Sequence, residues 1–132
     1  VVMIDLDNFK RVNTERGHRA GDAVICAIAD ALCEIARDDD CIARIGGDEF
    51  AAVLPGVGVE AARVFAERLI DAIAATPEAQ RSGVTASAGF ALSPLHGDTL
   101  EKLVFTADTA LMAVKDSGKD GGSSVARIVS AL

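Results

Sequence analysis

Short apolar runs alternate with longer amphipathic segments along the chain, and this alternation limits the fold more than any other sequence feature. The run at residues 1–6 ends in acidic residues, which predicts a buried strand. Over 22–37 the apolar side chains recur at helical spacing, which predicts a helix. Strands and helices interleaved in this way pack as one sheet covered by helices. The other predicted elements are strands at 41–45, 50–54, 84–92 and 125–129, helices at 59–75 and 99–114, and loops at 77–83 and 94–98.

The composition is that of one acidic globular domain. Half of the 132 residues are hydrophobic, and a chain of this length supplies one core of ordinary size. The formal net charge of −7 argues against a general nucleic-acid or anionic-membrane binder. No apolar stretch reaches the roughly 18 residues needed to span a bilayer. Cys26, Cys33 and Cys41 lack the spacing of a metal site, so we expect them to be small buried residues in a reducing compartment.

Two acidic clusters lie at tight backbone features. Asp5 and Asp7 close the first predicted strand, whereas Asp48 and Glu49 follow a Gly-Gly pair that predicts the turn of a β-hairpin. If the first strand pairs beside this hairpin, three of the four carboxylates converge, and their mutual repulsion then requires a cation. Mg²⁺ is the natural partner, because it takes oxygen ligands and keeps positions free for phosphate oxygens. The alternative is that Asp48 and Glu49 are ordinary turn residues.

Five segments of the chain together resemble the GGDEF domains of diguanylate cyclases. The string IGGDEF at 45–50 resembles the family signature, and DLDNFKRVN at 5–13 resembles its D-x-D-x-F-K-x-x-N segment. The other matches are GHRAGD at 17–22, VTASAG at 84–89, and ADTALMAVK at 107–115 followed by GK at 118–119. The resemblance implies an α/β (α+β) fold similar to nucleotidyl cyclases and polymerase palms. In that fold a central, mostly antiparallel sheet is flanked by helices, and a β-hairpin carries the GGDEF turn.

The resemblance also implies a domain organisation and a set of partners. Residues 1–132 are expected to form one GGDEF catalytic domain that lacks the family's N-terminal block, a helix leading into a D-x-L-T-G-L-x-N-R segment. An N-terminal sensor or receiver domain is expected before that block in the parent protein. The expected partners are GTP, cyclic di-GMP and a second copy of the domain, with no nucleic acid. The domain is expected in the cytoplasm, with membrane contact only through missing parts of the parent.

The implied reaction is the condensation of two GTP molecules into cyclic di-GMP with release of two pyrophosphates. Its implied cofactor is Mg²⁺, with Mn²⁺ as a substitute. By the match, Asp5, Asp48 and the backbone carbonyl of Leu6 supply metal ligands, and Glu49 is a further ligand or the base. The sequence leaves open whether Asp48 or Glu49 takes the proton from the attacking hydroxyl.

The resemblance assigns the substrate contacts to further positions. Glycine at 46 and 47 allows the backbone to approach the nucleotide. By this match the Asp22 carboxylate accepts hydrogen bonds from guanine N1–H and N2–H₂. It would reject adenine, whose edge lacks that pair of donors. For His18 a structural role is an equal alternative, and for Lys10 the alternative is a solvated surface lysine. The implied substrate contacts are Asn13 and Asp22 for guanine, His18 near the same pocket, the backbone N–H groups of Asn8 and Phe9 and the side chains of Lys10, Lys115 and Lys119 for phosphates, and Gly46 and Gly47 at the turn.

A second set of residues resembles the family's inhibitory product site. Arg37 and Asp40 form an R-x-x-D pattern five residues before the first signature glycine. Arg68 corresponds to the secondary arginine for the same ligand. A guanidinium can bind a phosphate or a guanine edge in a bidentate manner, and a carboxylate accepts from guanine. The alternative is a helix-end cation followed by a solvated acidic run.

Rival functions remain to be separated by experiment. One is a catalytically silent module that binds GTP or cyclic di-GMP and regulates an attached domain. Another is a hybrid synthase that also uses ATP, which Asp22 argues against. The last is an interaction domain without a ligand.

Overall fold

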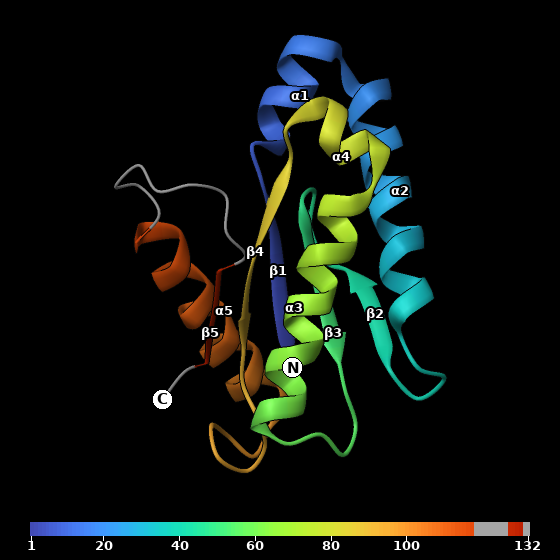
Figure 1. Ribbon diagram of the computed structural model, residues 1–132. Coiled ribbons are helices and arrows are strands. Elements are labelled where there is room, and N and C mark those ends of the chain that lie inside the picture. Colours follow the sequence, from blue (N-terminus) through green and yellow to red (C-terminus); the bar gives the residue numbers. More distant parts are fainter. Residues whose placement is uncertain (118–126, 131–132) are drawn as a thin grey trace.

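The computed structural model contains one five-stranded sheet in the order β2-β3-β1-β4-β5 (Figure 1). It describes residues 1–117 and the backbone of 127–130. Neighbouring strands are antiparallel except β4 and β5, which are parallel, so the predicted mostly antiparallel sheet is confirmed. The elements are β1 (Val2–Asp7), α1 (Phe9–Arg16), α2 (His18–Ile35), β2 (Cys41–Arg44), β3 (Glu49–Val53), α3 (Val59–Ala75), α4 (Pro77–Ser82), β4 (Thr85–Phe90), α5 (Leu100–Ser117) and β5 (Arg127–Ser130).

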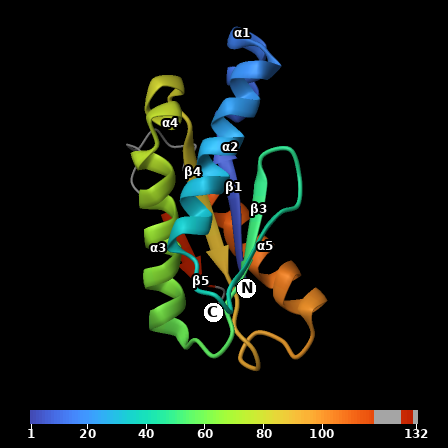
Figure 2. The ribbon, with the colours of Figure 1, turned by 90° about the vertical axis from the view of Figure 1, so that its right-hand side faces the viewer.

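Helices cover both faces of the sheet. Figure 2 shows α2 and α3 on one face and α5 on the other. Side chains alternate between the faces of a strand, so Ile4 and Leu6 of β1 join the larger core under α2 and α3. Met3 points the other way, into a smaller cluster with Leu111 of α5. Among the described residues, no helix has both the length and the apolarity to cross a bilayer.

Two helices near the start of the chain depart from the sequence prediction. The segment after β1 was not expected to be helical, yet it forms α1, which buries only Phe9 and Val12. So few apolar positions give no visible periodicity. Helix α2 begins at His18 rather than at 22. Gly21, which we expected in the loop before the helix, therefore lies within its first turns. A Cβ at Gly21 would lie 1.9 Å from Asn13 Oδ1, so the glycine lets α1 and α2 pack closely.

The predicted loop at 77–83 is wrong, because most of it forms α4. Thr76 Oγ1 accepts a hydrogen bond from the Ala79 N–H at 3.2 Å, and Pro77 occupies the start of the helix. Gly83 ends the helix in the left-handed region, with φ of 71°. This capping threonine, helix-start proline and terminal glycine are ordinary helix boundary signals. The predicted strand at 125–129 corresponds to β5, although 125–126 lie outside the described residues.

The prediction that the three cysteines are buried is also wrong. Cys26, Cys33 and Cys41 are all exposed. The first two are seven residues apart on α2, on the stripe opposite its core positions, which include Ile28 and Leu32. Cys41 lies on β2, an edge strand of the sheet.

Gly89 of β4 sets the close approach of α5 to the sheet. A Cβ at this position would lie 2.3 Å from the Ala107 carbonyl oxygen and 2.4 Å from the Leu111 backbone nitrogen. Both atoms belong to the backbone of α5, which cannot yield as a flexible side chain would. Gly89 also pairs with Met3 of β1, which belongs to the smaller core cluster.

Gly89→Ala is therefore expected to lower the free energy of unfolding by about 1–3 kcal/mol, because the methyl group pushes α5 away from β4. Urea unfolding followed by circular dichroism measures the change. Gly58→Ala is the matched control, since a Cβ there meets no atom within 4 Å. Equal midpoints for the two variants would contradict the proposed close packing at Gly89.

Candidate functional site

The acidic clusters at the end of β1 and at the hairpin turn lie side by side. In the β1–β3 register Asp5 is opposite Glu49. The Leu6 N–H donates to the Asp48 carbonyl oxygen at 2.9 Å, which ties the turn to the strand end. The structure thus brings Asp5, Leu6, Asp48 and Glu49 to one edge of the sheet. The pairing of the first strand beside the hairpin, on which the expected convergence depended, is observed.

Lys115 reaches this acidic site from α5, 110 residues along the chain from Asp5. Its Nζ donates to Asp5 Oδ1 and lies 3.6 Å from Asp7 Oδ1. The other oxygen of Asp7, Oδ2, accepts from Ser87 Oγ at 3.0 Å and from Thr85 Oγ1 at 3.3 Å. Asp7 is a site residue for which no role was predicted, although its place in the D-x-D string was the available signal.

Burial raises the pKa of the Asp5 carboxyl, and the negative charges of Asp48 and Asp7 add to this, whereas Lys115 opposes it. An acid with a raised pKa in the folded state favours folding below its ordinary pKa. That contribution is lost as the pH rises through the folded-state value. The ionised Asp5 is therefore a cost to the metal-free fold at neutral pH, as expected where carboxylates are gathered for a cation.

The donor set at this edge of the sheet fits a hard divalent cation. Carboxylates of Asp5 and Asp48 and the carbonyl of Leu6 are oxygen ligands of the kind that Mg²⁺ takes, and Mg²⁺ usually keeps several waters beside one or two carboxylates. Within the described residues, no three side chains of the types His, Cys, Asp and Glu form a ready-made metal site. The residues present therefore suit an open, partly hydrated metal position better than a closed protein cage.

Arg44 holds the Gly-Gly turn in place. Its Nε donates to the Gly46 carbonyl at 3.0 Å and its Nη2 to the Gly47 carbonyl at 2.9 Å. A Cβ at Gly46 would lie 2.5 Å from Glu49 Oε2, so this glycine leaves room for the Glu49 carboxylate. Sequence reasoning gave Arg44 no role, because nothing in its strand context marks a turn-binding arginine.

Most of the other residues predicted to contact the nucleotide lie on α1, on α2 and in the link before α1, outside the hairpin turn and α5. Asn8 adopts a left-handed conformation with φ of 66°, between β1 and α1. Asn13 of α1 lies against Gly21 of α2, so it is adjacent to the exposed Asp22. The predicted phosphate and pocket residues Lys10 and His18 are exposed, Phe9 is buried, and Lys119 lies outside the described residues.

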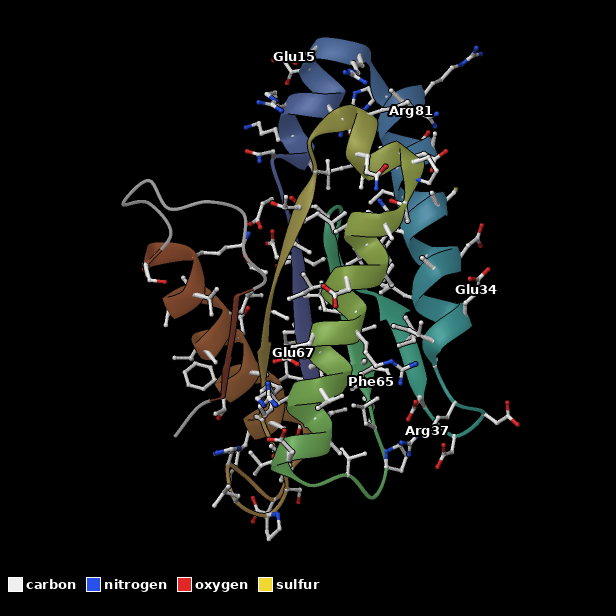
Figure 3. All side chains as sticks on the ribbon, viewed as in Figure 1. Glu15, Glu34, Arg37, Phe65, Glu67 and Arg81 are labelled. Atoms are coloured by element: carbon white, nitrogen blue, oxygen red, sulfur yellow. The ribbon has the colours of Figure 1, made fainter. Side chains whose placement is uncertain are left out.

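The predicted inhibitory residues occupy the link between α2 and β2 and the outer face of α3. The Arg37 N–H donates to Asp40 Oδ2 at 2.9 Å, and the Asp40 N–H donates to the Arg37 carbonyl at 3.1 Å. These two bonds form a tight turn from which the Arg37 side chain is exposed (Figure 3). Arg68 is exposed on α3, the helix that packs against α2.

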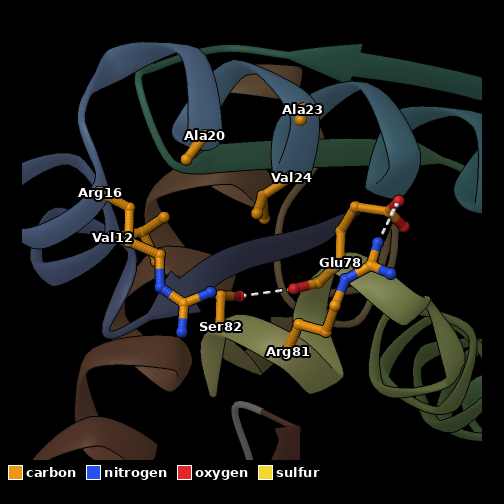
Figure 4. Close-up of a pocket in the computed structure, with 8 residues that line it drawn as sticks. All are labelled: Val12, Arg16, Ala20, Ala23, Val24, Glu78, Arg81 and Ser82. Atoms are coloured by element: carbon orange, nitrogen blue, oxygen red, sulfur yellow. Dashed lines mark hydrogen bonds and ion pairs between the residues drawn. The ribbon is translucent and has the colours of Figure 1, made fainter.

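A groove of about 180 Å³ lies between α1, α2 and α4 (Figure 4). Its apolar floor includes Val12 and Val24, and Arg16 and Arg81 also line it. Arg81 Nη2 pairs with Glu78 Oε1 at 3.0 Å. None of the residues predicted to bind metal, substrate or product lines this groove, so it is separate from the acidic site.

Comparison with known proteins identifies the family. The model of the family described as "Diguanylate cyclase, GGDEF domain" matches residues 1–121. Diguanylate cyclase DgcP of Pseudomonas aeruginosa is 41% identical over 91% of this chain and 18% of its own length. The active GGEEF domain of a diguanylate cyclase from Vibrio cholerae superposes with a TM-score of 0.81 at 27% identity, covering 99% of this chain and 81% of that one. The GGDEF domain of DgcB from Caulobacter crescentus, solved in complex with c-di-GMP, gives 0.75 at 27% identity, over 98% and 75%.

The chain spans less than a fifth of the length of the first curated relatives that it matches. The match nevertheless runs through every part of the acidic site described above, from β1 through the hairpin to the end of α5. The chain therefore belongs to the GGDEF family of diguanylate cyclase domains.

Proposed function

We propose that this chain is the catalytic domain of a diguanylate cyclase, which condenses two GTP molecules into cyclic di-GMP and releases two pyrophosphates. The observation that carries the proposal is the meeting of Asp5 with Asp48 and Glu49 where β1 pairs with the hairpin. Family membership supports the same reaction. The domain is proposed to work in the cytoplasm, where GTP is available, under an N-terminal sensor or receiver domain.

The proposed cofactor is Mg²⁺, with Mn²⁺ as a substitute. Asp5, Asp48 and the Leu6 carbonyl would hold it, and Glu49 would be a further ligand or the base. When bound, the metal neutralises charge on the phosphates of GTP. Lys10, Lys115, Lys119 and the N–H groups of Asn8 and Phe9 are proposed to bind those phosphates. Gly46 and Gly47 would let the backbone approach them.

In each half of the reaction, the ribose 3′-oxygen of one GTP attacks the α-phosphorus of the other. The new P–O bond forms as the bond to pyrophosphate breaks, and the hydroxyl proton passes to a carboxylate, either Asp48 or Glu49. One domain holds one GTP in this scheme. Two copies must therefore face each other, and a homodimer is part of the proposed mechanism.

Guanine specificity is assigned to the seam between α1 and α2. Asn13 and Asp22 come from the two helices and are adjacent through Gly21, so both can reach one base edge. A carboxylate accepts the N1–H and N2–H₂ donors of guanine together, and adenine would leave it unpaired. His18, at the start of α2, is proposed to line the same pocket.

Product inhibition is proposed for the turn at the end of α2. The Arg37 guanidinium is exposed, so it can bind a phosphate or a guanine edge, and Asp40 lies in the same turn. Arg68 would add a second cation for the same anionic ligand. The second candidate function is a catalytically silent GTP- or cyclic di-GMP-binding module. Nucleotide binding without turnover in the polypeptide that carries this chain would favour it.

Asp48→Ala is expected to lower cyclic di-GMP production from GTP and Mg²⁺ at least about a hundredfold, because it removes a carboxylate from the metal site. Product formation by the polypeptide that carries this chain is quantified by chromatography. Asp71→Ala, which removes an exposed acid on α3, is the control and should keep wild-type turnover. Normal turnover by Asp48→Ala would overturn the proposed metal site.

Asp22→Ala is expected to weaken the preference for GTP over ATP by about tenfold or more, because the carboxylate that recognises the guanine edge is lost. The two nucleotides are supplied in competition and the products are identified by mass. Asp30→Ala removes another exposed acid from α2 and should leave the preference unchanged. If Asp22→Ala discriminates as the wild type does, guanine is recognised elsewhere.

Arg37→Ala is expected to raise the inhibition constant for cyclic di-GMP about tenfold or more, because a charge-assisted contact to the product is removed. Initial rates are measured over a series of product concentrations. Arg81→Ala, on α4, serves as the control. An unchanged inhibition constant in Arg37→Ala would show that the product is bound at another site.

A further inference from the structure

We propose that Lys115 is an internal counter-cation that holds the carboxylate of Asp5 until a divalent metal displaces it, and that Asp7 then retains the lysine beside the site. This inference rests on the proposed metal site. It assigns Lys115 a role before nucleotide binds, and it makes Asp7 a positioning residue for the lysine.

The contacts of the lysine carry the first part of the proposal. Lys115 Nζ donates to Asp5 Oδ1, the carboxylate that pairs across the strands with the hairpin. The side chains of Lys115 and Asp5 are only 33% and 18% exposed, so water screens this ion pair less than a surface pair. Within the described residues, Lys115 is the hydrogen-bond donor to the Asp5 carboxylate, which is the group that a metal would need.

The two acidic partners of the lysine differ in how firmly they are held. Asp7 Oδ2 accepts hydrogen bonds from Ser87 and Thr85 of β4, so its carboxylate is fixed against the sheet. Its Oδ1 lies 3.6 Å from Lys115 Nζ, which is ion-pair distance. Among the described residues, no β4 side chain donates a hydrogen bond to the Asp5 carboxylate, which is therefore held less firmly than that of Asp7. A lysine that loses Asp5 therefore keeps an anionic neighbour and stays at the edge of the site.

Competition for Asp5 follows from these contacts. A divalent cation must replace the ammonium to use this carboxylate, so metal binding in the absence of nucleotide is weaker than the carboxylates alone would give. A triphosphate supplies new anionic partners for the ammonium and removes this competition. Metal and nucleotide are thereby expected to bind with positive coupling, which is reciprocal for the two ligands.

The test is a Mn²⁺ titration without nucleotide, in which the electron paramagnetic resonance signal reports free Mn²⁺. Lys115→Met is expected to tighten Mn²⁺ binding about two- to tenfold, because the competing ammonium is gone. Lys115→Arg keeps the charge and should bind Mn²⁺ close to the wild-type affinity. Lys102→Met is the matched control, because it removes an exposed lysine of the same helix whose ion pair with Asp98 lies outside the site.

A second readout guards against a loss of folding. The rise in thermal midpoint caused by saturating Mn²⁺ should be larger in Lys115→Met than in the wild type, and Lys115→Gln should behave in the same way. Wild-type binding of Mn²⁺ with no tightening in either variant overturns the counter-cation role and leaves the proposed function intact. Failure of the wild type itself to bind Mn²⁺ overturns the proposed metal site, and this inference with it.

Discussion

The antiparallel pairing of β1 with β3 is the constraint on which the site depends. Ile4 opposite Phe50 buries both side chains in the larger core, and the next pair, Asp5 opposite Glu49, must then point to the other face. A slip of one residue would bring the acids into the core and expose the apolar side chains, so burial fixes the register. The same apolar contacts that stabilise the sheet thus determine where its carboxylates meet.

Local patterns predicted the parts of the fold that have strong periodicity or turn chemistry. The apolar run at 1–6, the Gly46-Gly47 turn and the helix at 59–75 all correspond to observed elements. The short helices were missed for different reasons. Helix α1 buries two residues only, so it depends on tertiary packing to stay helical. Helix α4 has a capping threonine and a terminal glycine, but its short polar sequence was interpreted as a loop.

The residues alone predicted contacts only between neighbours in sequence, and the family resemblance added Lys115 as an expected phosphate contact. The D-x-D string and the signature turn could be placed next to each other by assuming that the first strand pairs with the hairpin. Two hydrogen bonds of the site depend on which side chains neighbouring elements present. Ser87 donates to Asp7, and Arg44 donates to the carbonyl of Gly46 in the turn. The contact from Lys115 to Asp5 spans 110 positions. It forms only because α5 packs at a short distance from the sheet. No local residue pattern predicts that distance directly.

Gly89 sets the short distance between α5 and the sheet, and this distance affects the acidic site. Because β4 carries no side chain there, the backbone of α5 lies close to the strand, and Lys115, about one turn beyond Leu111 on the helix, is brought within reach of β1. Burial and, to a smaller extent, the negative charges of Asp48 and Asp7 raise the pKa of Asp5, so the ionised carboxylate is a cost to the fold. The close approach of α5 offsets part of that cost, because it brings the Lys115 ammonium to the Asp5 carboxylate. Packing of the smaller core and the electrostatics of the site are therefore set by the same contact between helix and strand.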